Sequence, residues 1–137
     1  MPVDAAPSAP ATPRKRVLLI GLAPRAVDFS AFPGLDEPTL ARGLQAALDA
    51  VIAAGFAAEW CLVDADWERA GPQLAATLAG RSFAAVMIGA GVRTVAPHLR
   101  LFEQILNLVH EAAPGARLCF NTSPASTCEA VLRWVSP

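Results

Sequence analysis

Of two residue types that many catalytic and cofactor sites use, one is absent from this sequence and the other occurs once. It contains no tyrosine, and its only lysine is Lys15, which precedes the first apolar run. A domain without an internal lysine has neither a Schiff-base lysine nor the lysine of a P-loop. The absence of tyrosine also removes a side chain that could stack on a bound flavin.

Cysteines and long apolar runs are scarce as well. The three cysteines, Cys61, Cys119 and Cys128, are spaced too widely for a metal knuckle or a CxxC motif, so we expect no metal site and a reducing compartment. No stretch is long and apolar enough to cross a bilayer, and residues 1–16 lack the apolar core of a secretory signal. We therefore expect a cytoplasmic protein with no membrane partner.

Charge is low and nearly balanced. Lys and Arg together number 11 and Asp and Glu number 12, for a formal net charge of −1. Apart from the triplet Arg14-Lys15-Arg16, the basic residues are scattered along the chain. This distribution provides too little positive charge for a nucleic-acid-binding face, so we expect no nucleic-acid partner.

The beginning of the chain differs in composition from the rest. Residues 1–15 are rich in proline and alanine and predict a flexible tail, whereas residues 16–137 predict one α/β domain. Within the domain, short apolar runs alternate with segments of helical periodicity, and glycine and proline mark the boundaries. The expected strands cover 17–22, 57–64, 84–88 and 117–120, and the expected helices cover 38–54, 72–79, 95–113 and the segment after 124.

The alternation of strands and helices predicts how the chain folds. Continuous apolar strands separated by helices are typical of a doubly wound parallel sheet. Right-handed crossovers favour the strand order 2-1-3-4, with the second and third helices on one face and the first and last on the other. The expected architecture is a three-layer domain with a four-stranded parallel sheet, which is a flavodoxin-like fold without the fifth strand.

Such a sheet also predicts where a ligand would bind. Ligands lie beyond the carboxyl ends of the strands where the strand order reverses, here between the first and third strands. The segments 21–36, 89–94 and 121–123 would line that crevice. They and the helix start that follows contain the candidate ligand-binding residues Asp28, Gly89, Gly91, Arg93, Thr94, His98 and Asn121.

These candidates favour an anion as the ligand. Arg93 would pair with the anion, and the backbone amides around Gly89–Gly91 would cradle it. Asp28 and Asn121 would orient the bound molecule. The crevice therefore predicts a site for a small anionic metabolite.

Each candidate also has a structural interpretation. The two glycines can serve a tight strand-to-helix turn, and Arg93 can form a salt bridge with Asp28. Thr94 can cap a helix. His98 is the candidate acid or base, and its alternative is an ordinary surface histidine.

Two known uses of this architecture fit the residues poorly. The loop after the first strand, APRAVDFSAFPG, has few hydroxyl groups to hold a flavin phosphate, so we expect neither FMN nor another cofactor. The first and third strands end without acidic residues and the domain has no lysine, which argues against a response-regulator receiver.

The pattern from Val17 to Val135 resembles a family of small, uncharacterised flavodoxin-like proteins from bacteria and fungi. The segments VLLIGLAPRAVDFS, MIGAGVRT, LFEQILNLVHEAAP and FNTSPASTCEAVLRWV carry this resemblance. The resemblance implies the fold of nearly the whole domain but no particular reaction. Members of that family more often have an acidic residue where this chain has Ala23.

The sequence thus predicts a protein that binds a small anionic metabolite in the crevice between strands one and three, and it leaves open whether a reaction follows. The alternative is an oligomeric interaction module without a small-molecule site. That alternative rests on the 95–113 helix, which is apolar on two sides, and on the exposed edges of a four-stranded sheet. Either the helix or a sheet edge would then join copies of the chain.

Overall fold

A computed structural model describes residues 13–137 of the chain. Most of the predicted tail, residues 1–12, lies outside the described residues. The first strand begins at Arg16, where the predicted domain begins.

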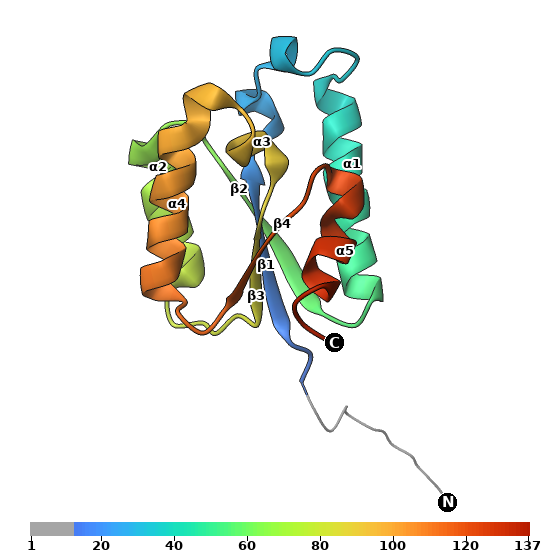
Figure 1. Cartoon of the computed structure of the whole chain (residues 1–137), viewed down its shortest axis with the longest axis vertical. Coiled ribbons are helices and arrows are strands. Elements are labelled where there is room, and N and C mark those ends of the chain that lie inside the picture. The colour runs from blue at the N-terminus through green and yellow to red at the C-terminus, as the bar shows by residue number, and fades with distance from the viewer. Residues whose placement is uncertain (1–12) are drawn as a thin grey trace, which may run out of the picture.

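Four parallel strands form the middle layer of the molecule (Figure 1). Their order is β2-β1-β3-β4, so the predicted order 2-1-3-4 and the three-layer α/β architecture are confirmed. Residues Val17–Ile20 of β1 pair with Ala85–Ile88 of β3, which brings the carboxyl ends of these two strands to the same level. The strands are β1 (Arg16–Leu22), β2 (Ala57–Val63), β3 (Ala85–Ile88) and β4 (Arg117–Phe120).

Helices cover both faces of the sheet, in the predicted grouping (Figure 1). One face carries α1 (Glu37–Ala53) and α5 (Thr127–Leu132), and the other carries α2 (Trp67–Leu78) and α4 (Leu99–Ala112). None of the helices in residues 13–137 combines the length and hydrophobicity of a membrane span.

The central strands are buried on both sides. On β1, Leu18 and Ile20 belong to the core beneath α2 and α4, whereas Val17 and Leu19 belong to the core beneath α1 and α5. All four side chains are fully buried. This double burial explains why the strand reads as an unbroken apolar run and not as an alternating one.

The start of α2 differs from the sequence prediction. The helix begins at Trp67, five residues before the expected start at Pro72. The Asp66 carboxylate caps it, because its Oδ1 atom accepts a hydrogen bond from the Glu68 amide at 3.0 Å. Pro72 consequently lies inside the helix, although a proline is usual only in the first turn.

The segment between β3 and α4 also differs from the prediction. The expected glycine loop is wound into a single helical turn, α3 (Ala90–Arg93). A 3-10 turn (Ala96–His98) follows, and α4 begins at Leu99 instead of Val95. Such turns are common at the beginning of helices.

Candidate functional site

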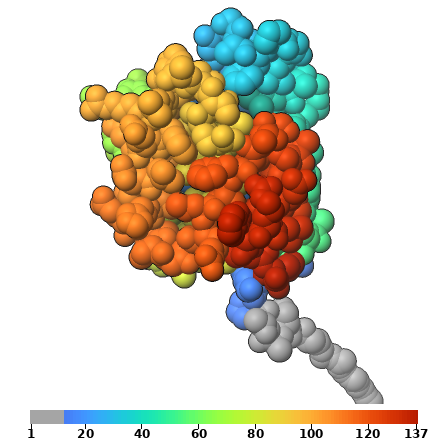
Figure 2. All heavy atoms as spheres, in the orientation of Figure 1, coloured from blue at the N-terminus to red at the C-terminus, as the bar shows by residue number. Residues whose placement is uncertain are grey.

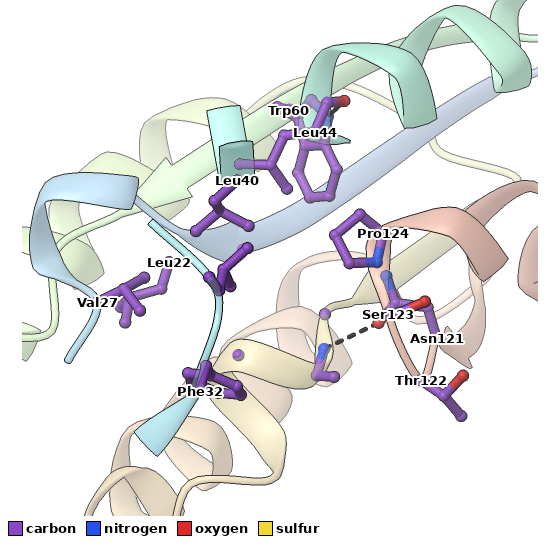
Figure 3. A pocket seen from close by; sticks show the side chains of 15 residues that line it. Leu22, Val27, Phe32, Leu40, Leu44, Trp60, Asn121, Thr122, Ser123 and Pro124 are labelled. Carbon is purple, nitrogen blue, oxygen red and sulfur yellow. Dashed lines mark hydrogen bonds between the residues drawn. The ribbon is translucent and has the colours of Figure 1, made fainter. Parts of the chain in front are cut away.

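A cavity of about 290 Å³ opens at the carboxyl ends of β1 and β3, where the strand order reverses (Figure 3). It thus lies where the topology places a ligand. Its lining is mostly apolar, and none of the described lining residues carries a charge. The lining residues are Gly21, Leu22, Val27, Phe32, Leu35, Leu40, Leu44, Trp60, Gly89, Ala90, Gly91, Asn121, Thr122, Ser123 and Pro124.

Trp60 of β2 forms a fixed wall of this cavity. Its indole Nε1 donates a hydrogen bond to the Leu44 carbonyl of α1 at 2.8 Å. The ring lies over Gly21 of β1, where an added Cβ would stand 3.1 Å from the ring atom Cζ3. The missing side chain of Gly21 therefore makes room for the indole, and the hydrogen bond holds the ring in one orientation.

The loop between β1 and α1 closes another side of the cavity with Val27, Phe32 and Leu35. This part of the chain, drawn in blue, forms one end of the molecule (Figure 2). Two carboxylates shape it: Asp28 accepts hydrogen bonds from Ser30, and Asp36 accepts one from the amide of Thr39 at the start of α1. The loop therefore covers this side of the cavity and is held by its own internal hydrogen bonds.

An ion pair holds the beginning of this loop. Arg25 Nη1 lies 3.1 Å from Asp64 Oδ2 at the end of β2, and Arg69 Nη1 lies 3.5 Å from the same oxygen. Hydrogen bonds from the Asp66 amide and from Arg25 lower the pKa of the Asp64 carboxyl below its ordinary value. The charged Asp64 thus connects the loop to β2 and α2.

Asn121 joins the two segments that form the opposite wall. Its side chain is buried, with 3% of its surface exposed. Its Oδ1 accepts a hydrogen bond from the Ala90 amide at 2.9 Å, and its Nδ2 donates one to Thr127 Oγ1 at 2.9 Å. Asn121 lines the cavity as predicted from the sequence, but both ends of its amide bind other parts of the protein.

Arg93, the expected partner of an anion, does not line the cavity. Its Nη2 donates a hydrogen bond to the Asn121 carbonyl at 2.5 Å, and its guanidinium lies 5.6 Å from the centre of the Phe120 ring. Its Nε is buried and has no hydrogen-bond partner in the described part of the chain. Because residues 90–93 form a helical turn, the arginine is carried to the end of β4 and away from the cavity.

Three other predicted residues also lie outside the cavity lining: Asp28, Thr94 and His98. Thr94 follows the end of α3 and donates a hydrogen bond from Oγ1 to the Ala90 carbonyl at 2.7 Å. His98 is half-buried and immediately precedes α4. Among residues 13–137, no ion pair includes Asp28 or Arg93, so the alternative salt bridge between these two residues is not formed.

Gly89 and Gly91 do line the cavity, but their backbone conformations do not require glycine. Gly89 has φ −74° and ψ 156°, which any residue adopts, and Gly91 is not among the glycines with positive φ. A Cβ at Gly89 would lie 3.4 Å from the Ile20 carbonyl oxygen, whereas one at Gly91 would meet nothing within 4 Å. The tight turn considered from the sequence is therefore not the reason for either glycine.

Sequence reasoning missed the apolar residues that give the cavity its character, among them Leu40, Leu44, Trp60 and Pro124. One signal could have revealed the wall at Trp60. Gly21 interrupts a buried apolar strand, and such a glycine marks a place where another group approaches the backbone closely.

In residues 13–137, no three His, Cys, Asp or Glu side chains gather as a metal site would require. The chain matches no protein-family model, and comparison with curated proteins and with solved structures gives no significant match.

Proposed function

We propose that the protein binds a small metabolite with an apolar body and one anionic end in the cavity between β1 and β3. The observation that carries this proposal is the cavity of about 290 Å³ with apolar walls at the reversal of strand order. Concave sites of this kind, with few polar groups, are the usual form of small-molecule sites. The apolar body would lie against Trp60, Leu40 and Leu44.

The anionic end would lie at the mouth of the cavity. A carboxylate deep inside would lose its hydration without meeting a charged partner among the described lining residues, which is costly. Thr122 and Ser123 are exposed at the rim, where their hydroxyls and water can solvate a charge (Figure 3). This arrangement replaces the pairing with Arg93 that the sequence predicts.

Three compounds with the same ring and different ends test the proposal: phenylacetate, phenylacetamide and ethylbenzene. We expect phenylacetate to shift the NMR signal of the Trp60 indole N–H in a saturable manner and to bind at least as tightly as the other two compounds. The indole N–H of Trp134 serves as an internal control, because this exposed residue follows the end of α5 and does not line the cavity. If no compound shifts the Trp60 signal, the site is wrong; if only ethylbenzene binds, the anionic end is wrong.

Further expectations from the sequence belong to this proposal. The strand order supports a flavodoxin-like domain, whereas the resemblance to the bacterial and fungal family stays a prediction. A cytoplasmic location, the absence of FMN and other cofactors, and the absence of nucleic-acid and membrane partners stay predictions.

The alternative, a homo-oligomeric module, has a narrower basis than the sequence indicates. On α4, Leu101, Ile105 and Val109 are buried in the chain's own core, and Phe102 and Leu106 pack against the same core. Most of the apolar surface of the helix is therefore covered by the domain itself. The large apolar side chains exposed in the described part of the chain are Leu99 at the start of α4, Ile52, Leu132 and Trp134, so self-association stays a prediction that sedimentation tests.

A further inference from the structure

A second depression lies at the amino ends of the strands, at the opposite end of the sheet from the cavity. It has a volume of about 500 Å³ and is wide open to solvent. The start of β1 and the connections α2–β3 and α4–β4 meet at this end of the molecule (Figure 1). The lining residues are Arg14, Lys15, Arg16, Ser82, Phe83, Ala84 and Gly115.

The depression is positively charged. Arg14, Lys15 and Arg16 are all exposed, and none of them forms an ion pair within residues 13–137. Arg14 donates a hydrogen bond to the Ile52 carbonyl at 3.3 Å, and Lys15 donates one to the Ser136 carbonyl at 2.9 Å. Ile52 and Ser136 are not lining residues, so these two cations border the depression, whereas the Arg16 side chain makes no hydrogen bond within residues 13–137. No carboxylate is among the described lining residues.

Uncharged donors complete the lining. The amide N–H groups of Ser82, Phe83 and Gly115 make no hydrogen bond to any other described residue, and neither does the Ser82 hydroxyl. The Phe83 side chain packs in the core with 4% of the residue exposed, while the residue also lines the depression. Because no other described group of the protein occupies them, these amides are available to an acceptor that enters the depression.

We propose that this depression binds the phosphate group of a small phosphorylated molecule. Guanidinium and ammonium groups form strong charge-assisted hydrogen bonds with phosphate, and backbone amides and a hydroxyl supply the remaining donors that its oxygens require. A small ligand fits better than a nucleic acid, because the chain has a net charge of −1 and few other basic residues near one another. The site is independent of the cavity, which lies beyond the other end of β1.

Titration of the full chain with inorganic phosphate and pyrophosphate at constant ionic strength tests this inference. We expect saturable NMR shifts of the Ser82, Phe83 and Gly115 amides, with chloride giving none. The double variant Arg14→Gln/Arg16→Gln should bind at least about tenfold more weakly, because the loss of even one charge-assisted hydrogen bond to the phosphate lowers the affinity by about that factor. Arg100→Gln, which removes an exposed arginine of α4 outside the depression, should bind like the wild type.

Three outcomes would overturn the inference. These are shifts that do not saturate, an Arg100→Gln variant weakened as much as the double variant, and a double variant that keeps full affinity. A short single-stranded RNA that binds at lower concentration than pyrophosphate would overturn the choice of a small ligand. The replaced side chains are exposed, so unfolding in urea should show that both variants stay folded.

Discussion

The side-chain carbonyl of Asn121 accepts a hydrogen bond from the backbone amide of Ala90 at 2.9 Å. This contact ties the exit of β4 to the first residue of α3, and both segments line the cavity. The same side chain donates to Thr127 at the start of α5, whose hydroxyl belongs to a fully buried residue. Three elements therefore meet on one amide group.

Replacing Asn121 by alanine should destabilise the protein. The change leaves the half-buried Ala90 amide and the fully buried Thr127 hydroxyl without their partner, and an unsatisfied buried group costs about 1–3 kcal/mol. Unfolding in urea measures the loss. The neighbouring exposed variant Thr122→Ala is the control and should change the free energy of unfolding by less than about 0.5 kcal/mol. Equal effects of both variants would show that Asn121 does not join these elements.

Gly21→Ala should lower the stability of the fold, whereas Gly91→Ala should not. An added Cβ at Gly21 would press against the Trp60 ring and should cost about 1–3 kcal/mol of stability. At Gly91 the new methyl group meets nothing, and alanine favours the helical turn of α3, so stability should be unchanged or slightly higher. Thermal unfolding of the two variants, together with the chemical shift of the Trp60 indole N–H, separates them. A destabilised Gly91→Ala would contradict the open space found there.

Low pH should remove the stability that two carboxylates of the loop between β1 and α1 contribute to the fold. Hydrogen bonds from Ser30 lower the pKa of Asp28, and hydrogen bonds from Thr39 lower the pKa of Asp36, in both cases from the ordinary value of 3.8. A carboxyl whose pKa is lower in the folded state stabilises the fold above pH 3.8 and loses this effect as the pH falls through the lowered value. Stability should therefore fall below about pH 4.

Asp36→Asn provides the matched comparison for this acid effect. Asparagine caps a helix as aspartate does but does not titrate, so the variant should keep α1 and depend less on pH below about 4. Urea midpoints measured between about pH 2.5 and 6 give the pH dependence of stability for the wild type and for the variant. If the two curves are parallel throughout, Asp36 makes no contribution to the acid effect.

The three thiols should react with iodoacetamide in a fixed order. Burial raises the pKa of Cys119 to about 11, and burial also raises the pKa of Cys61, so both stay protonated and inaccessible near pH 8. Cys128 is only partly buried and should be modified first. Mass spectrometry of peptides from native and urea-unfolded protein gives the order. Modification of Cys119 in the native protein as fast as that of Cys128 would contradict the burial found here.

The fold could be predicted because its determinants are local in the sequence. Doubly buried strands need continuous apolar runs, and Gly55 and Gly80, which have positive φ, mark the ends of the helices before β2 and β3. The start of α2 was missed because Asp66 and Pro72 each suit a helix start, and only the structure shows that Asp66 provides the cap.

The location of the site could be predicted from the sequence, but only some of the residues that line it could. The carboxyl ends of β1 and β3 follow from the strand order, and Gly89, Gly91 and Asn121 do line the cavity there. Arg93 does not, because the turn of α3 rotates it toward Phe120, and a four-residue turn leaves no periodic signal in the sequence. Reasoning from polar side chains also overlooked a cavity whose walls are apolar.

The central claim, that the cavity binds a small molecule, is tested most directly by filling it. Leu40→Trp places a larger side chain in the lining, and Leu99→Trp makes the same change at an exposed position outside it. Calorimetric titration with phenylacetate should give the wild-type affinity for Leu99→Trp and an affinity at least about tenfold lower for Leu40→Trp, a difference of about 1.4 kcal/mol. Equal affinities in the two variants, or no binding by the wild type, would contradict the claim.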